Sequence, residues 1–259
     1  MHHIENNPDI WAKYLPVKKR NDHKYNSGHA LIYAAPELTG ATRLAATACA
    51  RSGAGMVTVL TKKKVINVYR TSLPACILVR EDLNYISKTV TARIYGPGGL
   101  PVQPDYTSTL PTVLDADALF DLPDRLNENY ILTPHEGEFL KMFPEITGNS
   151  QTKAIQAAKT INAIIVLKGP ETVIADPEGR VVINKNGTPY LATAGTGDVL
   201  AGIIGGFLAQ GVPCFEASCA AVWLHADAAQ KIGCGLIADD IADYLPHVLA
   251  MQNTCIFKS

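Results

Sequence analysis

The chain has 259 residues, of which 47% are hydrophobic, so it is long and apolar enough for one large domain or two small ones and is not a disordered chain. Its 23 lysines and arginines against 24 aspartates and glutamates give a net charge of −1, and we expect no nucleic-acid partner. The N-terminus lacks the apolar core of a signal peptide and no apolar run is long enough to cross a membrane, which predicts a cytoplasmic protein without membrane contact.

The first predicted elements follow a polar, proline-spaced segment of residues 1–27, which we interpret as an N-terminal extension. Residues 29–33 form an apolar run that predicts a buried strand. Between residues 41 and 49, alanine, leucine and cysteine recur at the spacing of one helical face, and residues 56–60 form a second apolar, β-branched run. This order of strand, helix and strand is typical of an α/β fold.

Short apolar strands continue along the chain. They are predicted at residues 76–79, 92–95, 112–114, 131–132 and 164–167. A helix up to Ile161, capped by Ser150, is expected before the last of these strands, and residues 172–175 and 181–184 predict an antiparallel hairpin. We therefore predict one α/β domain over residues 1–259, with a mainly parallel central sheet, helices on both faces and a short antiparallel hairpin.

The last quarter of the chain is predicted to be helical. Helices are expected at residues 199–207 and 214–231, and an apolar stripe at residues 241–249 predicts a third helix that Pro246 should kink. Because these helices are apolar and rich in alanine, we expect a homo-oligomer, with a tetramer as one candidate state. The six cysteines have no metal-binding spacing and are interpreted as reduced, mostly core residues.

The stretch Ala192–Gly202, which reads Ala-Thr-Ala-Gly-Thr-Gly-Asp-Val-Leu-Ala-Gly, predicts a glycine loop that enters a helix. The backbone N–H groups of Gly195, Thr196 and Gly197 would lie free at the helix start, where donors and dipole attract anions. Asp198 could simply cap the helix, but a cap does not need two glycines, whereas a backbone that approaches a phosphate does. The pattern is neither a Walker A loop nor a dinucleotide fingerprint.

Ligands of parallel sheets bind beyond the carboxyl ends of the strands, so the segments that follow the predicted strands are candidate site residues. These segments are Gly96–Gly99, Asp115–Asp117, Thr133–Glu138 and Lys168–Thr172. For Gly96–Gly99 a plain turn and a ligand contact are both open. For Asp115 and Asp117, helix capping and catalysis are both open.

Two of these segments carry more specific expectations. Lys168 is expected to place its ammonium near the phosphate site, which would suit a nucleotide. His135 is expected to be a site residue, and zinc is excluded because the zinc-helix motif needs a histidine where Phe139 stands. We expect no metal site built by protein side chains, and we interpret His225 and Asp227 as structural or surface groups.

Taken together, these motifs resemble the NAD(P)H-hydrate dehydratase family of the ribokinase-like superfamily. The motifs that carry the resemblance lie at residues 40–46, 114–119, 132–139, 167–172 and 191–203. The similarity spans about residues 25–250; the glycine-loop motif is shared with related kinases, whereas Thr-Pro-His-Glu-Gly-Glu-Phe at 133–139 is much more specific to the dehydratases. The resemblance implies that ADP or ATP phosphorylates the ring hydroxyl of hydrated NADH or NADPH (NADHX or NADPHX, S form), after which phosphate leaves.

Carried over position by position, the resemblance also implies roles for individual residues. Nucleotide contacts are expected from Lys168, Gly169, Pro170, Glu171, Thr172 and Gly197, beside the loop residues Gly195 and Thr196. Ala41, Gly98 and His135 would contact the hydrate, and Asp198 would touch it as the base that takes the hydroxyl proton. A magnesium ion on the phosphates is expected, held largely by phosphate and water. A separate NAD(P)H-hydrate epimerase is an expected partner.

Two alternatives stay open from the sequence. A kinase of a small hydroxyalkyl heterocycle, of the thiamin-precursor type, would share the Gly195–Asp198 loop and release a stable phosphorylated product. A non-catalytic nucleotide-binding protein is favoured by residues 34–37, which read Ala-Ala-Pro-Glu where the family usually has a turn of Gly-Gly-Ser type. A glutamate in that turn is unfavourable next to the phosphates of a dinucleotide.

Overall fold

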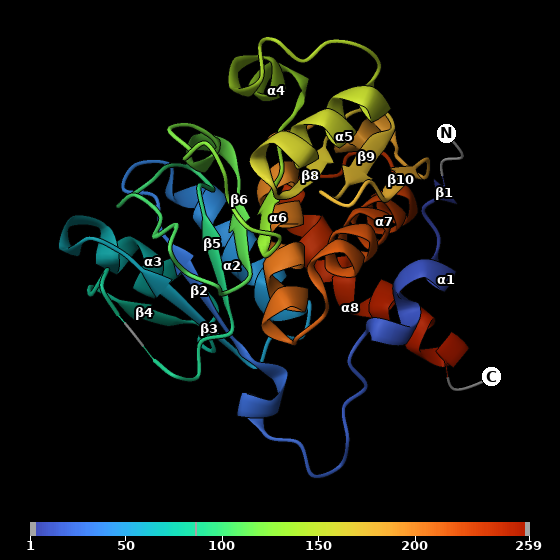
Figure 1. The fold of residues 1–259 in the computed structure, drawn as a ribbon. Helices are drawn as coiled ribbons and strands as arrows, with labels where there is room; N and C mark the ends of the chain where they lie inside the picture. Colours follow the sequence, from blue (N-terminus) through green and yellow to red (C-terminus); the bar gives the residue numbers. More distant parts are fainter. Residues whose placement is uncertain (1–3, 86, 257–259) are drawn as a thin grey trace.

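The computed structural model describes residues 4–85 and 87–256, and within them the chain forms one sheet of ten strands in the order β1-β10-β9-β8-β7-β6-β5-β2-β3-β4 (Figure 1). The strands are β1 (Ile4–Glu5), β2 (His29–Tyr33), β3 (Met56–Leu60), β4 (Leu78–Arg80), β5 (Ala92–Tyr95), β6 (Thr112–Leu114), β7 (Tyr130–Leu132), β8 (Ile164–Leu167), β9 (Thr172–Ala175) and β10 (Val181–Asn184). Only β9 among these runs antiparallel to its neighbours, β8 and β10. The predicted mainly parallel sheet with a short hairpin is confirmed.

Helices cover both faces of the sheet, as predicted. The larger layer contains α2 (Thr39–Arg51), α6 (Thr196–Ala209), α7 (Cys214–Ile232) and α8 (Ala238–Ile256), and the short α1 (Pro8–Trp11) packs against α7. The other face of the sheet carries α4 (Glu136–Met142) and α5 (Ser150–Ile161). Helix α3 (Ile66–Ser72) lies beside β4. Successive strand residues serve the two layers in turn: Ile32 packs with the first layer, and Leu31 and Tyr33 with the second. Both faces of the central strands are therefore buried, which explains their continuous apolar runs.

Helices α2 and α6 approach each other closely, and this contact fixes the start of α6. A Cβ atom added at Gly202 would lie 2.2 Å from the carbonyl oxygen of Ala45, so no larger residue fits there. At the N-terminal end of the same contact, a Cβ at Gly195 would lie 2.5 Å from Cδ1 of Leu44. The glycine loop is thus held against the first turns of α2, near the predicted site residue Ala41.

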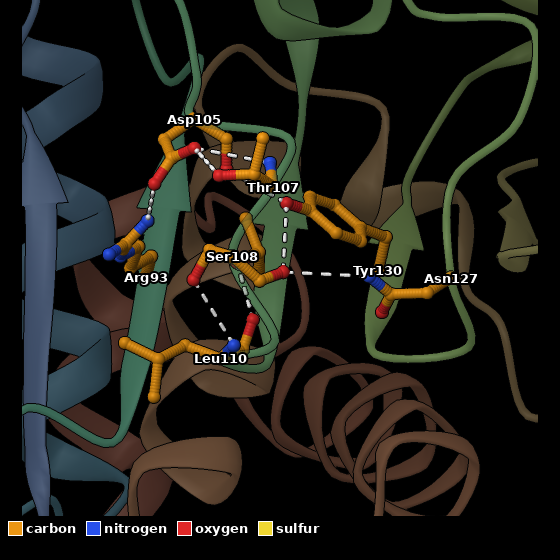
Figure 2. A network of polar contacts seen from close by, with 8 residues as sticks. Arg93, Asp105, Thr107, Ser108, Leu110, Asn127 and Tyr130 are labelled. Atoms are coloured by element: carbon orange, nitrogen blue, oxygen red, sulfur yellow. Dashed lines mark hydrogen bonds and ion pairs between the residues drawn. The ribbon is translucent and has the colours of Figure 1, made fainter.

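After β5 the chain turns at Gly96–Gly99 and returns to β6 without a helix. Figure 2 shows the polar network that holds this return: the Asp105 carboxylate accepts hydrogen bonds from Oγ1 of Thr107 (2.6 Å) and from the Arg93 guanidinium (3.5 Å). The hydroxyl of Tyr130 donates to the backbone oxygen of Asp105 (3.0 Å). The hydrogen bond from Thr107 is the largest cause of the lowered pKa of Asp105. The returning segment is therefore tied to both β5 and β7.

The N-terminal segment contributes elements that the sequence did not predict. Strand β1 pairs with β10 at one edge of the sheet (Figure 1). Trp11 is completely buried, with its ring 5.6 Å from that of Trp223 on α7. The short strand and the isolated tryptophan have no periodic pattern around them, so the sequence offered no signal for either.

Three local expectations from the sequence need correction. The cap of α5 is Asn149, whose side chain accepts from the Thr152 N–H (2.9 Å), and Ser150 is the first helical residue. Strand β4 begins later than predicted, and both Cys76 and Cys234 are exposed rather than buried.

Within the part of the chain that the structure describes, no helix is long and apolar enough to cross a membrane.

Candidate active site

The predicted site segments gather at the carboxyl ends of the strands. Beyond β7 and β8 the backbones of His135 and Lys168 continue side by side as an isolated bridge, with the Lys168 N–H donating to the carbonyl of Pro134 (2.8 Å). Gly96–Gly99 closes as a tight turn at the end of β5. This arrangement follows from the parallel strands, whose carboxyl ends share one edge.

Lys168 links the strand ends to the start of α6. Its ammonium donates to Oδ1 of Asp115 (3.0 Å) and lies 4.0 Å from Oε2 of Glu138. A Cβ atom added at Gly197 would lie 3.3 Å from the same ammonium, so the backbone of Gly197 and the Lys168 ammonium lie close together. The positive charge of Lys168 therefore stands beside the free N–H groups of the helix start, where an anion would be attracted by both.

Asp115 stands at the N-cap of the 3-10 helix Ala116–Leu119, but its side chain makes no capping hydrogen bond. It is buried, with 3% of its surface exposed, and the Oδ1 atom that pairs with Lys168 also accepts from the Thr133 hydroxyl (2.7 Å). The two contacts fix the carboxylate, which in turn holds the Lys168 ammonium in one place. Asp115 thus acts on the site through Lys168.

Gly195 and Thr196 determine the backbone conformation of the glycine loop. Gly195 caps α6 with a φ of 92°, which is strained for any residue with a side chain, so the first glycine of the pattern is required by the backbone. The Thr196 hydroxyl donates to the carbonyls of Leu191 (2.9 Å) and Thr193 (3.1 Å). The loop backbone is therefore fixed by its own side chain before α6 begins.

Asp198 lies in the first turn of α6, and its pKa is raised from the ordinary 3.8 to about 7. Burial is the largest cause; the negative charge of Asp115 adds to it, and the positive charge of Lys168 opposes it. A carboxyl group with this pKa can accept a proton near neutral pH, which is what a general base requires.

A cavity of about 600 Å³ opens beside Lys168. The lining of this cavity includes six of the predicted nucleotide contacts and also His135. The six are Lys168, Gly169, Pro170, Thr172, Thr196 and Gly197. Glu171, Gly195 and Asp198 are not in this lining, and neither are Ala41 and Gly98. An apolar wall comes from Leu200, Val222 and Ala226. The volume and the largely apolar wall suit a small organic ligand.

His225 belongs to the same cavity, although the sequence analysis interprets it as structural or surface. It is buried, burial lowers its pKa to about 4, and its Nε2 has no hydrogen-bond partner among the described residues. Val222, His225 and Ala226 share one face of α7 at helical spacing, and this periodicity was the available signal. The imidazole is therefore neutral near neutral pH. Asp227, in contrast, pairs with Lys231 on the helix surface (2.7 Å).

The predicted hydrate contacts divide into two groups. Ala41 and Gly98 touch: a Cβ atom at Gly98 would lie 2.9 Å from Cβ of Ala41 and 2.3 Å from the carbonyl oxygen of Leu38. His135 instead lies beside Lys168, where its Nδ1 accepts from the Glu138 N–H (3.1 Å) and 59% of its side chain is exposed. In the turn after β2, Ala35 is buried and Glu37 is exposed.

No three histidine, cysteine, aspartate or glutamate side chains in the described ranges gather closely enough to hold a metal ion. Asp115 and Glu138 both face the Lys168 ammonium.

The fold and the site define the class: this is a ribokinase-like α/β protein with a glycine loop at the start of a central helix. Its structure matches that of a ribokinase-like superfamily protein from Enterococcus faecalis with a TM-score of 0.84 and 26% identity, over 96% of each chain. A family model described as NAD(P)H-hydrate dehydratase matches residues 30–247. The chain belongs to the NAD(P)H-hydrate dehydratase family.

Two relatives give the similarity in more detail. The ADP/ATP-dependent NAD(P)H-hydrate dehydratase of Bacillus subtilis, co-crystallised with ATP and Mg²⁺, is 31% identical with a TM-score of 0.85, covering 97% of this chain and 99% of that one. The bifunctional NAD(P)H-hydrate repair enzyme of Coxiella burnetii is 33% identical over 264 residues, which is 92% of this chain and 53% of the relative. The chain thus spans about half the length of this relative and of two other bifunctional repair enzymes that it matches.

Proposed function

We propose that the protein dehydrates the S form of hydrated NADH or NADPH back to NAD(P)H, with ADP or ATP as phosphoryl donor. The observation that carries the proposal is Asp198: a carboxyl group with a pKa of about 7 in the first turn of α6, beside the Lys168 ammonium. Phosphorylation of a hydroxyl needs a base and an anion-binding environment in one place, and this position supplies both. Family membership supports the same reaction.

In the proposed mechanism the nucleotide occupies the cavity beside Lys168. Its phosphates lie at the N–H groups of Gly195, Thr196 and Gly197, where the Lys168 ammonium adds a positive charge. Residues 169–172 and the apolar wall hold the remainder of the nucleotide. Magnesium, held mainly by phosphate oxygens and water, supplies charge neutralisation on the phosphates when it is bound.

The hydrate lies on the other side of Asp198, against Ala41 and Gly98. His135, which also lines the nucleotide cavity, contacts the hydrate from the Lys168 side. Asp198 takes the proton of the ring hydroxyl as the hydroxyl oxygen forms its bond to the terminal phosphorus of the nucleotide. The bond from that phosphorus to the bridging oxygen breaks, so ADP leaves as AMP, or ATP as ADP. The lone pair of the ring nitrogen then expels the phosphate from the ring carbon, and loss of a proton from the adjacent carbon restores the double bond. The protein's part is to position the hydroxyl, accept its proton and hold the phosphates.

Several finer statements belong to the same proposal. Residues 1–259 form a single ribokinase-like domain that works in the cytoplasm as a homo-oligomer, with a tetramer as one candidate state. A separate NAD(P)H-hydrate epimerase acts with it, converting the other epimer of the hydrate. The similarity to bifunctional repair enzymes supports this last point.

The test is recovery of the near-ultraviolet absorbance of NADH from purified hydrated NADH, with magnesium and either ADP or ATP. We expect recovery with at least one nucleotide, and none with the Asp198→Asn variant. A stable phosphorylated product without recovery would instead identify a kinase of a small hydroxyl compound. Nucleotide binding with no turnover of any kind would identify a non-catalytic nucleotide-binding protein.

A further inference from the structure

One wall of the cavity beside Lys168 comes from the segment that follows β10. Asn184, Gly187, Thr188 and Pro189 line the cavity, and we call residues 184–189 the wall segment. Gly187 packs so closely on the start of the hairpin that a Cβ atom there would lie 2.8 Å from the carbonyl oxygen of Pro170. The wall segment and Pro170 therefore shape the cavity together.

A relay of asparagine side chains holds the wall segment. Nδ2 of Asn6 donates to Oδ1 of Asn184 (2.9 Å), Nδ2 of Asn184 donates to Oδ1 of Asn186 (2.6 Å), and Nδ2 of Asn186 donates to the carbonyl oxygen of Trp223 (3.0 Å). Asn6 and Asn184 are buried, with 4% and 2% of their surfaces exposed. Because every amide in the relay has a fixed donor and acceptor end, the orientation of one determines the orientation of the next.

Both ends of the relay are anchored in the fold. At its start, the backbone N–H of Asn6 extends the β1–β10 pairing by donating to Ile183 (2.8 Å), and its side chain also donates to the carbonyl of Cys219 on α7 (2.8 Å). At its end, the backbone oxygen of Asn186 accepts from Gln230 of α7 (2.8 Å). The N-terminal segment and α7 thus hold the wall segment between them, and Figure 1 shows β1 beside β10.

We propose that Asn6 is a positioning residue of the nucleotide site: through Asn184 and Asn186 it fixes the wall segment, so the N-terminal segment sets nucleotide affinity without touching the reacting atoms. The inference rests on the proposed nucleotide occupancy of this cavity. Asp198 does not line the cavity. Loss of the relay therefore weakens nucleotide binding but leaves the chemical step unchanged once nucleotide is saturating.

The experiment breaks the relay at each end and compares the result with a matched control. Asn6→Ala removes both hydrogen bonds that the buried side chain donates, and Asn186→Ala removes the side-chain hydrogen bond to Trp223 of α7. Glu5→Gln is the control, because Glu5 and Lys185 join the same two segments through an exposed ion pair (3.7 Å) that is not part of the relay. The dissociation constants of ADP and ATP with magnesium are measured by calorimetry, and KM and kcat by absorbance recovery.

We expect both asparagine variants to raise the nucleotide dissociation constant and KM by about five- to tenfold, the size of one or two lost neutral hydrogen bonds, with kcat within about twofold of the parent. Glu5→Gln should match the parent. Folding is followed by the melting temperature and by the emission of the chain's two tryptophans, Trp11 and Trp223, which lie together behind the relay.

Four outcomes would overturn the proposal. Folded variants that bind nucleotide like the parent would remove the positioning role, as would a fall in kcat with KM unchanged. Failure of both variants to fold would make the relay a requirement of folding alone. A parent protein that binds neither nucleotide would refute the proposed function itself, and the inference with it. That outcome is distinguishable from a failure of the variants alone, in which the parent still binds nucleotide.

Discussion

The two sides of the candidate site are built in different ways. On the nucleotide side, Lys168, Asp115 and the start of α6 are held by buried pairs and by a helix that packs on α2. On the hydrate side, Ala41 in the first turn of α2 meets Gly98 in the turn after β5, next to the exposed residues Glu37 and Leu38. The comparison teaches that the groups proposed for phosphate chemistry are held by buried contacts, whereas the proposed hydrate contacts adjoin an exposed turn.

The largest expected effect is on Asp198, which lies between the two sides. Asp198→Asn should lower kcat by about 10²–10⁴-fold, because a proton acceptor is lost, while the nucleotide dissociation constant stays within about twofold. Calorimetry and absorbance recovery on one preparation give both values. A variant that retains most of its rate would remove the proposed base.

The pH dependence gives the same residue a second, independent signature. The pKa of Asp198 is raised from the ordinary 3.8 to about 7, so the folded state binds this proton more tightly than the unfolded state. The resulting stabilisation of the folded state is fully present below pH 3.8 and is lost as the pH rises through about 7. Asp198→Asn should therefore raise the melting temperature by roughly 2–4 °C near pH 8 and by much less near pH 5. In the parent, kcat should rise with pH up to about 7. A rate that is flat from about pH 5 to 8 would contradict this.

A smaller but still large effect is expected on the nucleotide side. Lys168→Ala removes a charge from the phosphates and leaves the buried Asp115 carboxylate without its cation, so the dissociation constant of ADP should rise about 10–100-fold and the melting temperature should fall. Lys231→Ala is the control, since Lys231 forms a comparable pair with Asp227 on the surface of α7. Unchanged nucleotide affinity would contradict the assigned position of the phosphates.

On the hydrate side, Gly98→Ala should raise KM for the hydrate about five- to tenfold and leave nucleotide affinity unchanged. The new Cβ would lie 2.3 Å from the carbonyl oxygen of Leu38, so the turn must shift. Gly211→Ala is a matched control, because Gly211 has a φ of 85°, close to the 79° of Gly98, and nothing within 4 Å of the added atom. Equal KM values for the two variants would mean that backbone strain alone explains the effect.

The smallest effect is expected at Glu37. Glu37→Gln removes a negative charge from the exposed turn, and KM for the hydrate should fall about twofold at low salt and hardly at all at high salt, where exposed charges are screened. Steady-state measurements at two ionic strengths check this. A rise in KM would show that the glutamate helps to bind the substrate rather than repelling it.

The sequence predicted what depends on local pattern. The apolar runs of β2 and β8 gave their strand limits, and the two glycines around Thr196 located the start of α6. The contacts of Asn6 lay beyond such reasoning, because its partner Cys219 is 213 residues away in the chain. The helical spacing of Val222, His225 and Ala226 indicates a shared face, but which cavity that face lines depends on the packing of α7.

The pairing of β1 with β10 also has a consequence for the order of events at the ribosome. The first strand of the sheet has no partner until residue 183 has been synthesised, and Trp11 has no neighbouring ring until α7 has emerged. The edge of the sheet nearest the wall segment is therefore completed late, by a long-range closure that costs chain entropy. A ligand that binds only the closed form would favour this closure.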